Sequence, residues 1–331
     1  KLLVQVSRDT FENKGPKLTL RISLPGRFMV LAPSQSTIKI SRRLGDAEER
    51  NRLSRILTEL ANEGDGIIVR TAAGGTLEKD LSDDLDQLRL LWQGIEEKSA
   101  NEKAPQLVLD QAGSIYRNLV DLGVVNAERI TIDDVDVLTE LKREFGQIEA
   151  QNNRLEHYTG AIELFENFGI EEQIDAALSG TIILPSGGSV MIDEARALTA
   201  IDVNTGASKF GLPEELAFRT NLEAVDIIAQ EVRLQNLSGL IVIDVVSMRR
   251  EPNRTKILAQ LRNAMKTDPI PTHVLGYTKL GLIEMTRERR RESLTTILCG
   301  ANTGMREKSP LSNALDALRQ VRREAHVHAG R

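Results

Sequence analysis

The sequence predicts an α/β protein built from several domains. Its 331 residues are enough for two or three ordinary hydrophobic cores. Short apolar runs rich in β-branched residues alternate along the chain with longer stretches that carry leucine at helical spacing. Between residues 197 and 246 the order is strand, helix, strand, which favours parallel neighbours within one sheet. We therefore place the chain in the α/β class.

The composition excludes several classes of protein. Of the residues, 40% are hydrophobic and 27% are charged, as in ordinary globular proteins. No apolar run approaches the roughly 18 residues that a membrane-spanning helix needs. A single cysteine, Cys299, excludes an internal disulfide, so we expect a reducing, cytoplasmic setting. Because the formal net charge is −5, any binding of nucleic acid must come from local basic patches.

The first 114 residues are expected to form two units. Residues 1–20 alternate apolar and polar side chains around a loop at 13–15, which predicts a hairpin whose sheet continues upstream of residue 1. Residues 21–114 have the pattern of a small sheet with helices. The expected elements are strands at 22–33, 40–43 and 66–70, and helices at 46–62 and 77–98.

The turn at residues 70–75, RTAAGG, carries groups that bind a terminal phosphate. The guanidinium of Arg70, the hydroxyl of Thr71 and exposed backbone N–H groups at Gly74 and Gly75 together suit a phosphate monoester. Glycine turns after strands are common, so a purely structural turn is the alternative.

The rest of the chain continues the alternation of strands and helices. A strand at 129–134 and a helix at 135–145 are expected, and the aspartates at their junction are explained most simply as N-capping residues. The later elements are a hairpin turning at 186–188, strands at 197–204 and 239–246, helices at 213–235 and 254–266, a strand from 272 leading into an arginine-rich helix, and a helix within 305–331.

Two of these strands end in an aspartate. ALTAIDVN at 197–204 and GLIVIDVV at 239–246 each have the apolar pattern of a strand that is covered on both faces. A lone carboxylate at the last buried position is costly unless it is paired, hydrogen-bonded or bound to a cation. Because parallel strands end at the same sheet edge, we expect Asp202, Asp244 and Asn204 to form an oxygen-ligand site of the kind that Mg²⁺ prefers. The alternative is that each aspartate caps the next turn or helix.

Basic residues concentrate downstream of the second of these strands, in an otherwise acidic chain. This distribution suits an anionic polymer that is drawn to a metal site, although any single arginine can equally belong to a solvated helix face. The residues are Arg249, Arg250, Arg254, Lys256, Lys279, Arg287, Arg289, Arg290 and Arg291.

Several of these motifs resemble those of a known family. ALTAIDVNTG, FRTNLEA, GLIVIDVV and TKLGLIEMTRERRRESL, in this order, are similar to the catalytic region of the ribonuclease E/G family of bacterial endoribonucleases, and the match continues from residue 1 to about residue 298. The resemblance implies the end of an oligonucleotide-binding (OB-type) barrel at 1–20, a 5′-phosphate sensor at 21–114, a ribonuclease-H-like subdomain at 115–177 and a DNase-I-like catalytic subdomain at 178–298.

The resemblance implies a catalytic role for the aspartate strands. Asp202 and Asp244 would hold one Mg²⁺, with Asn204 as the third polar member of the site. The reaction would be metal-assisted hydrolysis of single-stranded RNA to 5′-phosphate and 3′-hydroxyl ends, in RNA processing and decay, including processing of ribosomal RNA.

The resemblance also implies two kinds of RNA contact outside the catalytic site. Arg70 and Thr71, with Gly26 and Val30 as the other wall, would bind a 5′-monophosphate that stimulates cleavage. Further contacts to RNA are expected from Arg8, Lys14, Lys17, Arg42 and Arg43. Phe11 is the candidate stacking platform. The alternatives are that the charges of 1–20 belong to a solvated strand face and that Phe11 is a core residue.

The resemblance to the ribonuclease E/G family breaks after Leu298, at Cys299. The family usually carries a two-cysteine segment here, through which two chains share one zinc ion. Because Cys299 stands alone, a dimer would supply two thiolates to a site that requires four ligands. We therefore expect a buried Cys299 rather than a zinc ligand, and a degenerate zinc-link segment and a helix over 299–331. The resemblance nevertheless implies a homo-oligomer, either a dimer or a tetramer.

Two other functions fit the same residues. One is a catalytically silent RNA-binding scaffold, and the other is a DNA-directed nuclease, because the chemistry of the site does not distinguish the sugars. Retention of both aspartates and of Asn204 favours an enzyme.

Overall fold

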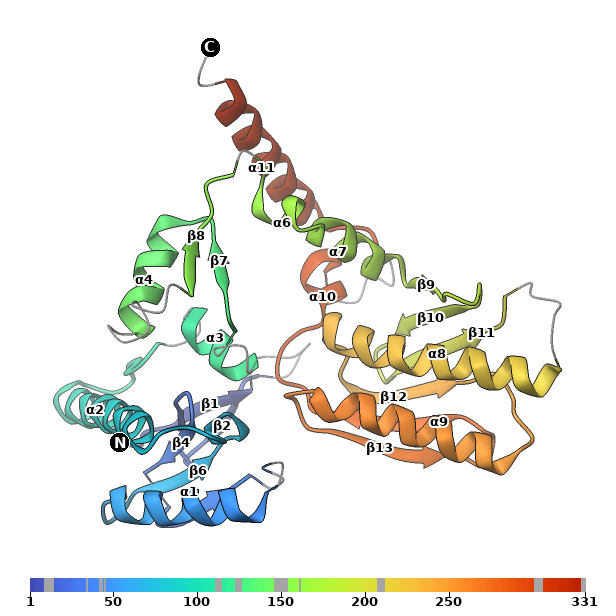
Figure 1. Ribbon diagram of the computed structural model, residues 1–331. Coiled ribbons are helices and arrows are strands. Elements are labelled where there is room, and N and C mark those ends of the chain that lie inside the picture. The colour runs from blue at the N-terminus through green and yellow to red at the C-terminus, as the bar shows by residue number, and fades with distance from the viewer. Residues whose placement is uncertain are drawn as a thin grey trace. The chain divides into compact units, whose positions relative to one another are not determined.

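The computed structural model describes residues 1–8, 15–33, 35–41, 44, 46–110, 115–122, 127–145, 154–160, 162–206, 212–300 and 306–328. The chain divides into two compact units, one of Lys1–Ser7 with Pro16–Thr159 and the other of Arg8–Gly15 with Gly160–Arg331. Both units mix strands and helices, as predicted (Figure 1). Within the described ranges, no helix combines the length and the apolar character that crossing a membrane would require.

The first unit is built around a four-stranded mixed sheet. Its strands lie in the order β3-β4-β6-β5, with β3 at Leu24–Pro25, β4 at Met29–Ala32, β5 at Ile38–Ile40 and β6 at Gly66–Val69. Helices α1 (Ala47–Leu60) and α2 (Glu78–Asn101) contribute leucine and isoleucine side chains to the core of this unit. The start of α1 follows from its cap, because Asp46 accepts a hydrogen bond from the N–H of Glu48 at 2.9 Å.

The single strand predicted at 22–33 is wrong, because a tight turn divides it into β3 and β4. The carboxylate of Asp84, on α2, accepts hydrogen bonds from the backbone N–H groups of Arg27, Phe28 and Met29 at 2.9, 2.9 and 3.2 Å. A Cβ on Gly26 would lie 2.5 Å from an oxygen of Asp84, so this close approach requires glycine. The turn therefore depends on a side chain from a distant part of the sequence.

Two smaller sheets complete the description of the N-terminal half. β1 (Gln5–Arg8) pairs with β2 (Lys17–Thr19), and most of the hairpin loop expected between them falls outside the described residues. Parallel strands β7 (Ile130–Ile132) and β8 (Leu155–His157) pack with α3 (Ile115–Leu122) and α4 (Val135–Phe145).

The predicted strand and helix at 129–145 are confirmed as β7 and α4. Asp134 caps α4 by accepting hydrogen bonds from the N–H groups of Asp136 and Val137 at 2.9 and 3.0 Å, as expected. Strand β8 was not predicted, because its three residues lack an apolar pattern of their own.

The second unit is organised by a six-stranded sheet in the order β13-β14-β12-β11-β10-β9. The strands are β9 (Thr181–Ile183), β10 (Ser189–Glu194), β11 (Thr199–Asn204), β12 (Gly239–Asp244), β13 (Thr272–Tyr277) and β14 (Ile283–Arg287). β11 and β12 are parallel, and the other neighbouring strands are antiparallel. The predicted strand, helix, strand unit with parallel neighbours is confirmed.

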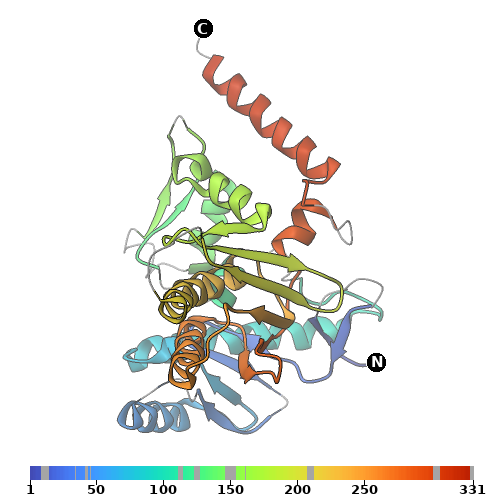
Figure 2. The same ribbon diagram turned by 90° about the vertical axis from the view of Figure 1, so that its right-hand side faces the viewer.

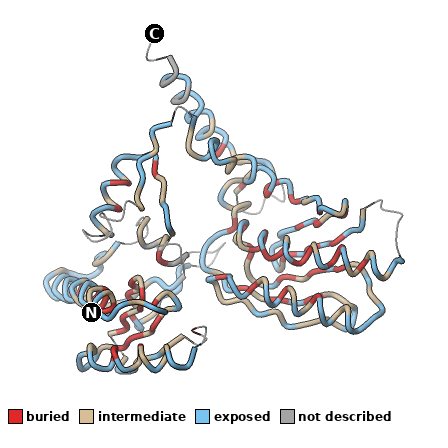
Figure 3. The backbone as a smooth tube through the Cα atoms, in the orientation of Figure 1, coloured by how far each residue is buried: buried red, intermediate tan, exposed pale blue. Residues whose placement is uncertain are grey.

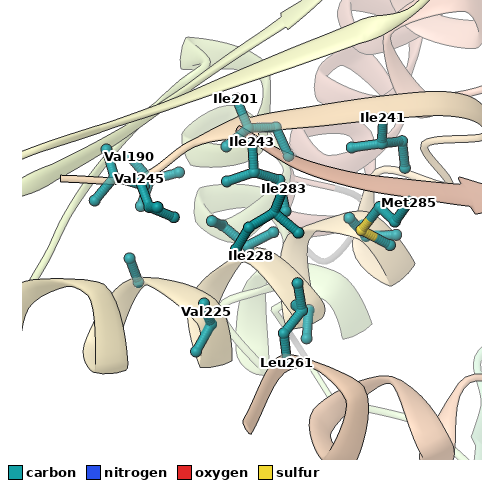
Figure 4. Close-up of a cluster of buried hydrophobic side chains, with 14 of the residues drawn as sticks. Val190, Ile201, Val225, Ile228, Ile241, Ile243, Val245, Leu261, Ile283 and Met285 are labelled. Carbon is teal, nitrogen blue, oxygen red and sulfur yellow. The ribbon is translucent and has the colours of Figure 1, made fainter. Parts of the chain in front are cut away.

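Helices α8 (Pro213–Leu234) and α9 (Glu251–Ala264) lie side by side against one face of this sheet (Figures 1 and 2). Val225 and Ile228 of α8 and Leu261 of α9 meet a layer of isoleucines from the strands (Figure 4). Figure 3 shows the buried residues along the strands and on the sheet-facing sides of these helices. This core fixes the positions of the strand ends that carry the aspartates.

The arginine-rich helix predicted after residue 272 is wrong. The segment forms the hairpin β13–β14, which turns at Gly281, where φ is +92°. Ile283, Met285 and Arg287 alternate towards the core, and β14 also pairs with β12. Helix begins later, in α10 (Leu294–Cys299), where Ser293 is the N-cap.

The remaining described α-helices are α6 (Leu164–Asn167), α7 (Ile170–Ser179) and α11 (Pro310–His328), and a short 3₁₀ helix, η2 (Met265–Thr267), follows α9. The helix predicted within 305–331 is confirmed as α11, which runs away from the six-stranded sheet of its own unit in both views (Figures 1 and 2).

Candidate active site

The two strand-terminal aspartates are direct neighbours in the sheet. In the parallel pair β11–β12, Asp202 lies opposite Asp244. Neighbouring strands are about 4.8 Å apart, and residues that face each other across a ladder project from the same side of the sheet. The structure therefore brings the two carboxylates together, as the sequence predicted.

The aspartates lie on an open face of the sheet, and the prediction that both faces are covered is wrong. Along β11 the residues alternate between buried and exposed. Ile201 and Ile243 enter the core under α8 and α9, whereas Asp202 and Asp244 are exposed on the opposite side. The two carboxylates are thus accessible to water and to a polymeric ligand, so their ionised forms do not carry the desolvation cost of a buried charge.

The capping alternative is not supported at either following helix. α8 begins after Leu212 and α9 begins after Arg250, and neither helix has a side-chain hydrogen bond at its N-cap. The aspartates therefore do not serve as helix caps there.

Asn204 lies on the same exposed face of β11 as Asp202. Its amide Nδ2 donates a hydrogen bond to Oδ2 of Asp202 at 2.7 Å, which fixes the orientation of that carboxylate. Among the described residues, no group of three or more His, Cys, Asp or Glu side chains is placed to hold a metal ion. Two carboxylates and an amide oxygen, open to water, nevertheless fit Mg²⁺, which binds few protein oxygens and keeps several water molecules.

Two residues that were not predicted as site residues hold the segment after Asp244. Asn221 of α8 is fully buried, donates to the carbonyl of Val246 at 2.7 Å and accepts from the N–H of the same residue at 2.9 Å. Glu214 accepts from the backbone N–H groups of Arg249 and Arg250 at 2.8 and 3.1 Å. The sequence signal for the first of these contacts is that Asn221 stands at helical spacing from Ala217, Ala224 and Val225, which puts a polar residue on the apolar face of α8.

The cations after Asp244 have different environments. Arg249 and Arg250 are exposed, and the guanidinium of Arg254 lies 4.5 Å from the centre of the Tyr277 ring. Arg287 is not a surface cation as predicted: it is buried and forms an ion pair with Asp268, Nε to Oδ2, at 2.7 Å. The inward alternation of β14 explains this difference.

The residues of the expected phosphate pocket meet in the first unit. Arg70 follows β6 and donates from Nη1 to the carbonyl of Gly26 at 3.2 Å and from Nη2 to the carbonyl of Val120 at 2.6 Å. Val30 lies on β4, opposite Ile68 of β6. Thr71 is exposed and begins the short 3₁₀ helix η1 (Thr71–Ala73).

The predicted exposed N–H groups of the glycine turn are already used. The N–H of Gly74 bonds to the carbonyl of Thr71 at 3.3 Å, and that of Gly75 bonds to Oε1 of Glu49 at 2.8 Å. Hydrogen bonds from Arg52 and from Gly75 lower the pKa of Glu49 to about 2, so this carboxylate is negatively charged at neutral pH. The prediction that the N–H groups of Gly74 and Gly75 are exposed is therefore wrong.

Several expected RNA contacts lie outside the described residues: Phe11, Lys14, Arg42 and Arg43. Arg8 ends β1, but its side chain is also outside the description.

Cys299 ends α10 and is buried, as expected, and burial raises the pKa of its thiol.

Comparison with known proteins gives consistent similarities. A sequence profile of the ribonuclease E/G family matches residues 23–290. Ribonuclease G of Escherichia coli is 37% identical over 303 residues, which cover 90% of this chain and 61% of that protein. Ribonuclease E of Nostoc sp. is 33% identical over 299 residues, covering 89% of this chain and 44% of that protein. The chain thus spans about three fifths of the length of the curated ribonuclease G proteins that it matches.

Proposed function

Because this chain belongs to the ribonuclease E/G family, we propose that it is a Mg²⁺-dependent endoribonuclease acting on single-stranded RNA. Cleavage would leave 5′-phosphate and 3′-hydroxyl ends and serve RNA processing and decay. The observation that carries this proposal is the pairing of Asp202 with Asp244 on an open face of the six-stranded sheet.

In the proposed mechanism, Asp202 and Asp244 hold the metal ion. A divalent ion bound there would neutralise charge on the phosphodiester and acidify a water molecule. The amide of Asn204 keeps the Asp202 carboxylate in one orientation through their 2.7 Å hydrogen bond. Asn221, by its two contacts to Val246, holds the backbone that follows Asp244. The exposed arginines after this strand attract the phosphate backbone.

We also propose that Arg70 and Thr71 bind a 5′-monophosphate on the RNA and that this binding stimulates cleavage. The guanidinium of Arg70 is held by the carbonyls of Gly26 and Val120, and this preorganises it. A charge-assisted bond from a fixed guanidinium is a strong way to recognise a phosphate monoester.

One experiment separates the proposal from the alternatives. The same single-stranded sequence is offered as RNA and as DNA, each with Mg²⁺ and with EDTA. We expect cleavage of RNA in Mg²⁺ alone, and analysis of the ends should give 5′-phosphates and 3′-hydroxyls. Cleavage of both polymers would indicate a general nuclease, whereas tight RNA binding without cleavage would indicate a scaffold.

We also propose that the chain forms a homo-oligomer, again from its similarity to the family. The family similarity favours a homo-oligomer, and the buried Cys299 favours an interface without a zinc link. Sedimentation equilibrium with and without a zinc chelator measures both, and the expected mass is that of a dimer or a tetramer in either buffer.

A further inference from the structure

A concave site lies in the second unit at the opposite end of the strands from the aspartates. It has a volume of about 460 Å³, and the residues that line it include Leu240 of β12, Thr286 of β14, His273 of β13, Ala197, Glu288 and Arg289. Thr286 is the ladder partner of both Leu240 and His273, so these three side chains share one face of the sheet.

This face is the open face that carries the aspartates. Leu240 and Asp244 are four residues apart on β12, and alternate residues of a strand project from the same side. At a rise of about 3.3 Å per residue, the site begins about 13 Å from the carboxylates. A polymer bound at the aspartates and following β12 would therefore reach the site within a few monomer units.

The walls of the site differ in chemistry from a phosphate cradle. Leu240, which is 55% exposed, and Ala197 provide apolar surface, whereas His273 and Arg289 provide planar groups with hydrogen-bonding edges. Gly239 has a φ of +86°, and a Cβ there would lie 2.5 Å from Nη2 of Arg289. The glycine thus lets the guanidinium lie flat against the start of β12.

We infer that this site binds one base of a single-stranded RNA, a few nucleotides from the aspartate pair. The identity of the polymer rests on the proposed function. A mostly apolar concavity with a few polar groups suits a flat heterocycle, and imidazole and guanidinium planes are the surfaces on which unstacked bases lie. Its position on the same open face makes it a subsite of the strand that reaches Asp202 and Asp244, and a base in it would contribute to the choice of cleavage position.

The test compares a mixed-sequence RNA oligonucleotide with the same ribose-phosphate chain lacking its bases. Dissociation constants are measured in EDTA, so that no cleavage is needed. For the double variant His273→Ala/Leu240→Ala, which keeps every arginine, we expect about tenfold weaker binding of the intact RNA and less than twofold weaker binding of the abasic chain.

Arg289→Ala and Arg291→Ala form the pair of charge changes. Both remove one cation from the same segment, but Arg291 does not line the site. Arg289→Ala should weaken the intact RNA more than the abasic chain, and Arg291→Ala should weaken both equally. His273 and Leu240 are exposed, so the double variant His273→Ala/Leu240→Ala should melt at the temperature of the unaltered chain.

Equal effects on the intact and abasic chains, or no effect on either, would overturn the base-binding inference. Loss of the proposed function has a different signature, namely absence of RNA cleavage in Mg²⁺ by the unaltered chain. If the base-dependent binding pattern were observed without cleavage, the base site would stand and the nuclease assignment would not.

Discussion

The amide of Asn204 donates from Nδ2 to Oδ2 of Asp202 at 2.7 Å and to the sulfur of Met191 at 3.9 Å, and the shorter bond orients the Asp202 carboxylate. Replacing Asn204 with alanine would free this carboxylate to rotate and remove an amide oxygen from the site. Loss of such an orienting contact typically costs about 10–100-fold in metal affinity or activity. We therefore expect Asn204→Ala to raise the Mg²⁺ concentration needed for half-maximal cleavage by about that factor.

A titration of cleavage rate against Mg²⁺ measures this effect. Asn263→Ala is the control, because Asn263 is an exposed residue of α9. An unchanged Mg²⁺ requirement in Asn204→Ala would show that Asn204 does not support the site.

Arg70 is the residue on which the proposed preference for a 5′-monophosphate depends. Replacing Arg70 with glutamine removes the guanidinium that bonds to the carbonyls of Gly26 and Val120. The ratio of cleavage rates for 5′-monophosphorylated and 5′-hydroxyl RNA should fall to about one, because the phosphate loses its charge-assisted partner. Arg129→Gln, an exposed change in the same unit, should keep the ratio of the unaltered chain.

The milder change Thr71→Val guards against a folding artefact, since Thr71 is exposed. A lower ratio there, with an unchanged melting temperature, would support the pocket. If the ratio persisted in both Arg70→Gln and Thr71→Val, the 5′-phosphate site would lie elsewhere.

The sequence predicted that Asp202 and Asp244 meet at one edge of the sheet but not how exposed they are. The strand, helix, strand order predicts parallel neighbours, and the register observed between β11 and β12 then places Asp202 opposite Asp244. Ala200 and Leu240 are apolar residues on the exposed face, so the strands looked buried on both sides. Exposure depends on which elements cover a face, and that information is absent from the strand itself.

At the scale of the element, α8 holds the segment that follows Asp244 through Asn221. This side chain satisfies both backbone groups of Val246, just beyond β12. Asn221→Ala would leave the N–H and the carbonyl of a half-buried residue without these partners, at a cost of about 1–3 kcal/mol in the free energy of unfolding. Urea denaturation measures the loss, and cleavage should fall with it because the segment after Asp244 loosens.

The exposed change Asn263→Ala should alter the free energy of unfolding by less than about 0.5 kcal/mol. Equal stability of the two asparagine variants would contradict the positioning role of Asn221.

The elements that the sequence predicted correctly are those with local signals. α4 and α8 carry local signals, namely the Asp134 cap and a proline in the first turn, and their predicted bounds agree with the structure to within a residue or so. β14 leads into a run rich in arginine, Arg287 to Arg291, which favours a surface helix, yet Ile283–Arg287 is a strand because β12 and β13 pair with it on both sides. Such pairing is non-local, so the segment alone could not show it.

At the scale of the whole molecule, one buried ion pair connects distant parts of the second unit. Arg287 of β14 bonds to Asp268, which precedes β13, and Nη1 of Arg287 also donates to the carbonyl of Leu237 after α8 at 3.0 Å. Burial opposes ionisation of Asp268, but hydrogen bonds from Arg287, Ile270 and Thr272 outweigh it. The pKa of Asp268 therefore lies below its ordinary value of 3.8.

This lowered pKa predicts a dependence of stability on pH. Because folding favours the ionised carboxylate, its contribution is present above pH 3.8 and is lost as the pH falls below that value through the folded-state pKa. The melting temperature of the unaltered chain should fall more steeply below about pH 4 than that of Asp268→Asn, which lacks this titration. Parallel curves would contradict the assignment.

Removing the carboxylate should also be costly at neutral pH. Asp268→Ala would leave the guanidinium of Arg287 buried without its counter-ion, which typically destabilises a protein by about 3–5 kcal/mol. Chemical denaturation at pH 7 measures this, and a loss below about 1 kcal/mol would show that the pair is dispensable.

The most direct test of the central claim is cleavage of one 5′-monophosphorylated RNA by the unaltered chain and by Asp202→Asn, Asp244→Asn and Asp193→Asn. Asp193 is an exposed carboxylate on the same face of the neighbouring strand β10, so it controls for the loss of one negative charge. We predict Mg²⁺-dependent cleavage by the unaltered chain and by Asp193→Asn, and none by the other two variants, with RNA affinity nearly unchanged in all four. Retained Mg²⁺-dependent cleavage in Asp202→Asn or Asp244→Asn would contradict the shared metal site.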